Sequence, residues 1–468
     1  MVALHSEFIA GCLFLLSALM LRPDGWLEAG ILAAGLAVGP ALHTKPAYSG
    51  AWLACLLPLL EHRLLGSDWV PLAASCLWSA GLLSLAAFGE QRWTRLVCAG
   101  CWLTALGAAV AAPAGAASAA AWAEAARLAQ CSGFGLYLHR HMSGSLSPVE
   151  LVLLTQLLRH LFPAYPLACF CLSSGLVAMD AICRHCLATS AQPVRFTYRG
   201  LIVATLNTCS FGYYALSARL FRPATVARQL LDLANLAALN WQLVSAWLAL
   251  FGASLLLAGL SGRLPLRQMT QRKLFHFLAA AAFAVALLLG GDQRLELLSA
   301  AAFGLLAILL ALDTLRRHDV AGVGRRLRSL LAPLIGPRDS AQLLLTPLAL
   351  LLGLAAPIWL RLAGGRGAGI PAWAGILSVG VGDSLAGLVG SRFGRVRWPQ
   401  MSRTLEGSAA CFFGQLASLR CLLSASGLDS AGWPAYLLPV FSVTLVEAFL
   451  AQVDNLALPL CLYFLLAQ

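Results

Sequence analysis

The chain has 468 residues, of which 60% are hydrophobic and only 11% are charged. Soluble domains carry about 25% charged residues, so this composition excludes a soluble globular protein and indicates a polytopic membrane protein. The formal net charge is +12, and Lys45 and Lys273 are the only lysines, so nearly all of the positive charge is arginine. In membrane proteins such an excess marks the cytosolic loops, and we favour that interpretation over nucleic-acid binding.

The fold class follows from the length of the apolar runs. A transmembrane helix needs about 20 apolar residues, which leaves room for roughly 13 to 15 helices. Lipid offers no hydrogen bonds to a backbone, so helices are the expected form, and the apolar runs are continuous rather than alternating as in a β-barrel. We therefore expect an all-α, multi-pass integral membrane protein. The first apolar segment lacks a basic region before it and is expected to be a retained span, not a removable signal.

The chain divides near residue 240 into two regions. Residues 1–240 form a membrane region of unclear role, with spans expected near 8–21, 27–42, 51–60, 69–88, 95–112, 116–138, 150–162, 165–182, 199–218 and 224–240. Residues 241–468 form the expected catalytic membrane domain, with spans near 241–260, 275–290, 295–312, 342–362, 372–390, 406–425, 434–452 and 455–467.

The connections of the second region alternate in charge. Those at 261–273, 313–341 and 391–405 are rich in basic residues, whereas those between them are poorer in positive charge. Strict alternation of spans places the three basic connections on one face, and the positive-inside rule makes that face cytosolic.

Asp383 lies in an apolar helix just after Gly380 and Gly382. A carboxylate within a membrane helix is costly and marks a functional site by default, and glycines let a backbone approach a ligand closely. The structural alternative is a buried aspartate paired with an arginine. The functional interpretation is a ligand for Mg²⁺ or a base for an attacking hydroxyl.

A basic group opens an earlier helix. Arg272, Lys273 and His276 are spaced so that they can share one helical face. One interpretation is a basic anchor whose side chains extend to the lipid headgroups. The other is a phosphate clamp in which Lys273 acts as a compact charge on phosphate oxygens.

Two further stretches carry acidic residues. In the first, Thr404 is placed to cap a helix and Glu406 falls in its first turn, where a helix N-terminus can also bind an anion. In the second, Glu447 and Asp454 lie two turns apart on one face if their helix continues through both. Their structural alternative is a carboxylate pair that bridges to loop arginines.

The expected topology brings ionisable side chains from distant stretches to a similar depth. They are Lys273, His276, Asp383, Glu406, Glu447 and Asp454. Carboxylates beside several basic groups suit a metal-bound polyphosphate, because Mg²⁺ is commonly held by one or two carboxylates plus substrate phosphates. Asp383 and Glu406 could supply those carboxylates.

These motifs occur in an order that resembles the dolichol kinase family of CTP-dependent polyprenol kinases. The matching stretches are RKLFH at 272–276, GILSVGVGDSLAGLVGSRFGRVRWP at 375–399, RTLEGS at 403–408 and the run from Glu447 to Leu460, and the resemblance extends over about 265–468. It implies transfer of the γ-phosphoryl group of CTP to the terminal hydroxyl of dolichol, giving dolichyl phosphate for protein glycosylation. It also implies an endoplasmic reticulum membrane protein whose active site faces the cytosol. One departure is Arg403, where the family usually has lysine.

The resemblance implies the CTP-binding segment given below, whereas the catalytic and metal-binding sets are our hypothesis from the residues themselves. The catalytic set is Asp383, Lys273, His276 and Glu406, and the metal ligands are Asp383, Glu406 and Asp454. The CTP-binding segment comprises Ser391, Arg392, Phe393, Gly394, Arg395, Val396, Arg397, Trp398, Pro399, Arg403, Thr404, Leu405, Glu406 and Gly407. Supporting residues are Arg272, Gly380, Gly382, Glu447 and Asn455.

The mechanism that we expect relies on positioning and on neutralising the developing charge. Lys273, Arg397 and Arg403 would neutralise phosphate oxygens, and either Asp383 or His276 would take the hydroxyl proton. The preference for CTP rests on the resemblance alone. The expected partners are CTP, dolichol and membrane lipid, with no nucleic acid.

Two kinds of alternative remain open at this point. A CTP-dependent lipid cytidylyltransferase, or another lipid-alcohol kinase of the same superfamily, would have a similar membrane site but a different product. A proton-coupled transporter would also need intramembrane carboxylates. Against the transporter, the sequence shows no internal repeat of the kind that transporters often have, and its polar residues are expected near one end of the bundle.

Overall fold

The structure is a computed structural model, and it describes residues 51–59, 130–139, 145–162, 164–182, 223–260, 268–318, 343–367, 369–399, 401–426, 432–450 and 454–467, with a few isolated positions besides. The expected spans near 69–88, 95–112 and 199–218 lie outside these residues, and those near 8–21 and 27–42 lie almost wholly outside them. The basic connections at 261–273 and 313–341 are also largely outside.

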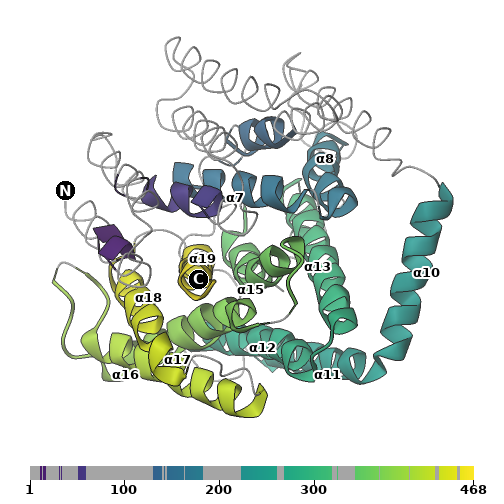
Figure 1. Cartoon of the computed structure of the whole chain (residues 1–468). Coiled ribbons are helices and arrows are strands. Elements are labelled where there is room, and N and C mark those ends of the chain that lie inside the picture. Colours follow the sequence, from purple (N-terminus) through teal and green to yellow (C-terminus); the bar gives the residue numbers. More distant parts are fainter. Residues whose placement is uncertain are drawn as a thin grey trace, which may run out of the picture.

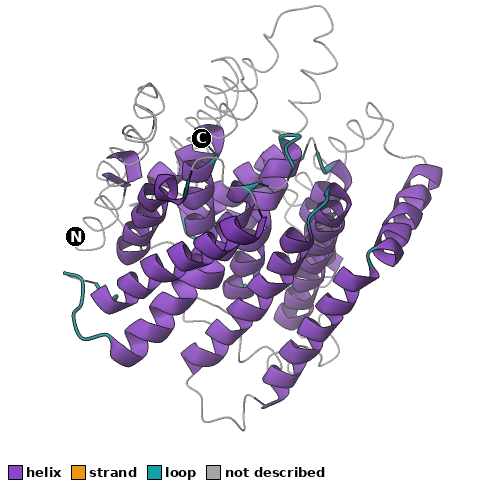
Figure 2. Ribbon diagram, turned by 60° about the horizontal axis from the view of Figure 1, so that its bottom comes forward, coloured by secondary structure: helices purple, strands orange, loops and turns teal. Residues whose placement is uncertain are grey.

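The described residues form a bundle of helices (Figures 1 and 2). Its elements are η2 (Ala51–Cys55), α7 (Pro148–Leu161), α8 (Pro166–Ile182), α10 (Pro223–Leu239), α11 (Trp241–Leu260), α12 (Gln268–Leu289), α13 (Asp292–His318), α15 (Leu345–Ala363), η6 (Ile370–Trp373), η7 (Ile376–Asp383), α16 (Ser384–Phe393), α17 (Leu405–Ser426), η8 (Trp433–Tyr436), α18 (Leu437–Phe449) and α19 (Asp454–Leu466). Within them no strand occurs, apart from one isolated bridge between Arg397 and Thr404.

Five of the described helices are long and apolar enough to cross a membrane. They are Met269–Leu289, Asp292–His318, Leu345–Ala363, Ile370–Phe393 and Leu405–Ala425. A sixth span is possible if Leu231–Leu239 and Trp241–Leu257, which meet at a bend of 87°, act together. The all-α, multi-pass fold class is thus confirmed, while the range of 13 to 15 helices concerns the whole chain and stays a prediction.

Helix α11 shows how the outer helices meet lipid. Its apolar side chains include Leu248, Phe251 and Leu255, and each is more than half exposed in the isolated chain. Large apolar patches on a surface signal contact with a membrane or a partner. Their place on a helix without charged residues fits a lipid-facing wall.

Helices α15 and α19 lie side by side in the middle of the bundle, with α7 on one side and η7 on the other (Figure 1). They pack closely because Gly353 of α15 faces the backbone of Asn455 at the start of α19. A Cβ atom at Gly353 would overlap the carbonyl oxygen of Asn455. This glycine therefore fixes the depth at which α19 begins.

Three expected spans differ from the observed helices. Helix α12 is already helical at Gln268, before the expected start at 275, because polar residues such as Gln and Arg are good helix formers. The span expected at 372–390 contains a π-helix, η7, which runs from Ile376 to Asp383. The span expected at 434–452 is wrong at its end, since α18 stops at Phe449 and Leu450 is extended, with ψ 128°.

Candidate active site

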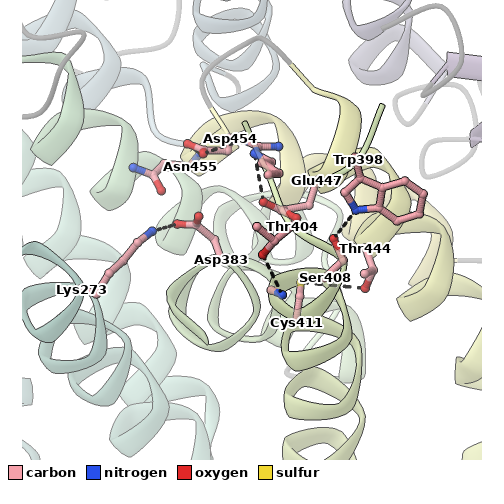
Figure 3. A network of polar contacts seen from close by, with 12 residues as sticks. Lys273, Asp383, Trp398, Thr404, Ser408, Cys411, Thr444, Glu447, Asp454 and Asn455 are labelled. Atoms are coloured by element: carbon pink, nitrogen blue, oxygen red, sulfur yellow. Dashed lines mark hydrogen bonds and ion pairs between the residues drawn. The ribbon is translucent and has the colours of Figure 1, made fainter. Parts of the chain in front are cut away.

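The centre of the site is an ion pair between Lys273 of α12 and Asp383, the last residue of η7 (Figure 3). Nζ of Lys273 lies 2.5 Å from Oδ2 of Asp383, and the two side chains are only 4% and 8% exposed. Buried charges need a partner of opposite sign, so each side chain stabilises the other. The structural alternative for Asp383 named an arginine as its partner, and the partner found is Lys273, which is buried and not extended to the headgroups.

The backbone beside this pair is unusual. Segment η7 is a π-helix, a form that occurs mostly as short interruptions and is frequent at functional sites. The two glycines before Asp383 make room for neighbouring helices. A Cβ atom at Gly380 would meet Ala280 of α12, and one at Gly382 would lie 2.8 Å from Nε2 of Gln415 in α17.

His276 lies one turn beyond Lys273 on α12 and is also buried. Its Nδ1 atom is 2.8 Å from the carbonyl oxygen of Arg272. Because a carbonyl oxygen can only accept, Nδ1 must carry the hydrogen. In the neutral ring the free lone pair is then on Nε2, which can accept a proton.

A second cluster forms around Arg403, which precedes α17. Its Nε atom lies 3.2 Å from Oε1 of Glu447, and its Nη2 atom lies 3.3 Å from Oδ2 of Asp454. Burial opposes the charged form of Arg403, but the carboxylates of Glu447 and Asp454 outweigh it and raise the pKa of the guanidinium group. The arginine therefore stays positively charged.

The two acids of this cluster reach Arg403 from different helices. Glu447 lies near the end of α18 and Asp454 begins α19, with Leu450 extended between them. The expectation that both lie on one face depended on a helix that continues through both, and α18 ends at Phe449. The structural alternative, a carboxylate pair that bridges to a loop arginine, is the arrangement found.

The two clusters are joined through the first turn of α19, which packs against η7. Figure 3 draws Asn455 on the same side of α19 as the Lys273–Asp383 pair, next to Asp454. The Asn455 side chain is buried, and within the described part of the chain its Oδ1 atom has no hydrogen-bond partner, nor has Nη1 of Arg403. A buried acceptor and a buried donor without partners are what a bound ligand would satisfy.

The loop between α16 and α17 folds into a short hairpin. The backbone N–H of Trp398 donates to the carbonyl of Arg403 at 3.0 Å, and that of Leu405 donates to Val396 at 2.9 Å. The indole of Trp398 donates to Oγ of Ser408 at 2.9 Å and its ring lies 5.1 Å from that of Phe449. These contacts hold the hairpin against the starts of α17 and the end of α18.

Glu406 secures the base of this hairpin. Its Oε1 atom accepts hydrogen bonds from the backbone N–H groups of Arg395 and Val396, at 2.9 and 3.1 Å. Thr404 caps α17 as expected, since its Oγ1 accepts from the N–H of Gly407 at 3.2 Å. The Glu406 carboxylate thus binds the backbone of the loop before α17 and does not contact Asp383.

The remaining residues of the predicted CTP-binding segment lie on the surface. Ser391, Arg392 and Phe393 end α16, and the chain continues through Gly394 to Pro399. The side chains of Arg392, Arg395 and Arg397 are exposed. Exposed guanidinium groups such as these are accessible to an anion from water. Arg272, which belongs to α12, is half-buried beside Lys273.

The residues partly fit a divalent cation. No group of three or more histidine, cysteine or acidic side chains in the described segments is arranged to hold a metal ion. Asp383, Asp454 and the unpartnered oxygen of Asn455 are hard oxygen donors, the kind that Mg²⁺ prefers.

Sequence reasoning missed one buried polar group. Gln415 of α17 is fully buried, and its Nε2 atom lies 3.1 Å from Sγ of Cys411 and 3.5 Å from Oγ1 of Thr444 in α18. It also packs against Gly382, one residue before Asp383. A glutamine in the middle of an apolar span is the signal that could have identified it.

Comparison with known proteins agrees with the chemistry of this arrangement. No protein-family model matches the chain. The chain is similar to dolichol kinases. It is 40% identical over 205 residues to the dolichol kinase of Bos taurus, 38% identical over 205 residues to that of Homo sapiens, and 35% identical over 200 residues to dolichol kinase EVAN of Arabidopsis thaliana.

The similarity covers part of each protein. Each match spans 42% of this chain, but only 37% of the cattle and human proteins and 34% of the Arabidopsis protein. The relatives agree in name across animals and a plant.

Proposed function

We propose that the chain is a dolichol kinase that transfers the γ-phosphoryl group of CTP to the terminal hydroxyl of dolichol. The observation that carries the proposal is the pair of adjacent charged clusters, the buried Lys273–Asp383 pair and the partly buried Arg403–Glu447–Asp454 group. The similarity to dolichol kinases supports the substrate class. The chemistry needs little covalent participation from a protein and depends on positioning and charge.

In this proposal the hydroxyl oxygen of the lipid forms a bond to the γ-phosphorus as the bond from that phosphorus to the β–γ bridging oxygen breaks. CDP leaves with the electron pair, and the hydroxyl proton passes to Asp383 or to Nε2 of His276. Lys273 keeps the Asp383 carboxylate ionised and oriented, and its ammonium group also lies where a phosphate oxygen would arrive. Nη1 of Arg403, which has no hydrogen-bond partner among the described residues, would donate to another phosphate oxygen.

A divalent cation, Mg²⁺ or a similar ion, would supply charge neutralisation on the triphosphate. Asp383, Asp454 and Asn455 would hold it. Glu406 serves instead to shape the loop that receives the nucleotide, because its carboxylate is occupied by two backbone N–H groups. The exposed arginines 392, 395 and 397 would bind CTP phosphates before transfer.

The catalytic unit in this proposal is the membrane domain 241–468, since both clusters come from it. The protein would lie in the endoplasmic reticulum membrane with the basic 391–405 loop in the cytosol, where the positive-inside rule places such loops. CTP is a cytosolic solute there, so the donor would reach the exposed arginines directly.

The test is transfer of label by the purified chain in lipid nanodiscs. With CTP labelled in the γ-phosphate, the proposal expects label in dolichol; with label in the α-phosphate, it expects none. Removal of divalent cations with a chelator should stop the transfer, and added Mg²⁺ should restore it. Label arriving from the α-phosphate would instead identify a cytidylyltransferase, and proton flux without either product would identify a transporter.

A further inference from the structure

An apolar cavity of about 100 Å³ lies between α7, α8, α13 and α15, apart from the polar clusters. Its walls are mostly leucine side chains. Among its described lining residues Glu150 is the only charged one, and it is engaged with Ser147 in the cap of α7. Apolar cavities of this kind stay dry and bind apolar groups, so the expected ligand is a hydrocarbon.

The lining residues show that the cavity is long and follows the helices. Helix α15 contributes Leu345, Leu348, Leu352 and Trp359, which fall on one face. At a rise of 1.5 Å per residue, the fourteen steps from Leu345 to Trp359 cover about 21 Å. A linear chain of isoprene units fits this shape better than a compact molecule does.

One wall is aromatic. The rings of Phe303 in α13 and Trp359 in α15 stack with their centroids 4.1 Å apart, and Tyr165 lies 5.1 Å from Phe303. Phe303 and Trp359 both line the cavity. The stacked rings give this wall a rigid apolar surface.

Along the chain, the cavity and the polar clusters come nearest where α15 crosses α19. Its lining includes Leu352 and Leu456, and these are the chain neighbours of Gly353 and Asn455, which touch at the crossing. Asn455 carries the buried oxygen that has no partner among the described residues, and Asp454 beside it is bound to Arg403. Leu456 of the cavity wall and Asn455 of the proposed phosphoryl-transfer site are thus neighbours in α19.

We infer that this cavity holds the isoprenoid chain of the lipid alcohol, with the hydroxyl end directed past Leu456 to the Lys273–Asp383 pair. The inference rests on the proposed function and extends it. Helices α7 and α8 lie outside the stretch that resembles dolichol kinases, 265–468. The cavity therefore gives the N-terminal membrane region a role: it forms the half of the lipid site that senses chain length.

A cavity-filling substitution tests the chain-length claim. Leu157 of α7 lines the cavity and is 3% exposed, whereas Leu153 of the same helix is 1% exposed and does not line it. We expect Leu157→Trp to raise KM for long-chain dolichol about tenfold and to leave kcat/KM for a ten-carbon prenol within twofold. Leu153→Trp, which overpacks the same helix, should not change the ratio between the two substrates. If Leu157→Trp fails to fold, Leu157→Phe takes its place.

A second measurement does not depend on catalysis. A polyprenol with a diazirine at the end far from its hydroxyl is bound to the Asp383→Asn protein without nucleotide, irradiated, and the labelled peptides are sequenced. We expect label in α7, α8 and α13, displaced by unlabelled dolichol. A phospholipid that carries the diazirine in its acyl chain should give less label there, and dolichol should displace that label.

The outcomes separate the two proposals. Phosphorylation from CTP with no label in α7 or α8, or with unchanged chain-length preference in Leu157→Trp, would overturn the inference about the cavity while the proposed function stands. Label in those helices without any phosphorylation by the wild-type chain would overturn the kinase proposal and leave a polyprenol-binding site. Label by the phospholipid that dolichol cannot displace would show an ordinary lipid site and end the inference.

Discussion

Nζ of Lys273 lies 2.5 Å from Oδ2 of Asp383, although 110 residues separate them in the chain. The contact joins α12 to the π-helix η7, and both partners are buried. A charge buried at this place is costly unless its partner is present. Single variants of Lys273 and Asp383, compared with the double variant, therefore separate the contribution of the pair to stability from its contribution to catalysis.

Lys273→Met alone leaves the Asp383 carboxylate buried without its partner. We expect it to destabilise the protein by about 3–5 kcal/mol, the cost of breaking a buried pair from one side. The double variant Lys273→Met with Asp383→Leu should regain most of that stability and remain inactive. Thermal unfolding in detergent, followed by intrinsic fluorescence, gives the stabilities. A single variant as stable as the wild type would mean that water reaches the pair.

Arg403 binds its two carboxylates through two different nitrogens, which a lysine cannot reproduce. The dolichol kinase family, which the chain resembles, usually has lysine at this position. We therefore expect the positive charge of this residue to matter more for activity than the shape of its side chain. We predict that Arg403→Lys keeps activity within about tenfold, a change of about 1.4 kcal/mol in the barrier, and that Arg403→Gln loses at least about a hundredfold. Initial rates at saturating CTP measure both. Equal losses would show that the two-nitrogen geometry is essential.

Glu406 holds the loop through the N–H groups of Arg395 and Val396. Glu406→Gln keeps the shape but removes the charge from these hydrogen bonds, each worth about 1.5–3 kcal/mol when charged. We expect KM for CTP to rise and kcat to hold, because binding is weakened equally in the ground and transition states. The concentration of Mg²⁺ giving half-maximal rate should not move. A fall in kcat together with a higher Mg²⁺ concentration at half-maximal rate would contradict this role. It would support the prediction from the sequence that Glu406 is a metal ligand.

Gly353 permits the crossing of α15 and α19. Gly353→Ala would drive a methyl group into the carbonyl oxygen of Asn455, and overpacking of this kind costs about 1–3 kcal/mol. We expect a lower melting temperature together with loss of activity, since Asn455 and Asp454 would shift. Gly252→Ala in α11 is the matched control, because nothing lies within 4 Å of its added Cβ atom. Unchanged melting of Gly353→Ala would contradict the packing described for α19.

Much of the site could be predicted because ionisable residues are rare in this chain. Asp383 is predicted from the cost of a carboxylate in an apolar helix, and Lys273, Arg403, Glu447 and Asp454 are predicted from their charge and spacing. The structure gathers these five residues in two clusters. The sequence does not predict which acid meets which base: the structural alternative for Asp383 named an arginine as its partner, and the structure pairs it with Lys273. The pairing depends on the relative depth of helices, which no local pattern encodes.

The remaining errors have local causes. Helix α18 ends at Phe449, but no glycine or proline in the sequence predicts this end, because the next residues are Leu450, Ala451, Gln452 and Val453. The π-helix before Asp383 leaves the apolar pattern unchanged, because only the hydrogen-bond register differs. Gln415 was passed over because one amide among apolar residues gives a weaker signal than a charge.

The most direct test of the central claim is single-turnover transfer from γ-labelled CTP to dolichol by the purified wild-type chain and by Asp383→Asn. The wild type should label the lipid, and Asp383→Asn should be slower by at least about a thousandfold, or about 4 kcal/mol in the barrier, while it still binds CTP. Transfer by Asp383→Asn at the wild-type rate would contradict the assignment of the active site to the Lys273–Asp383 pair.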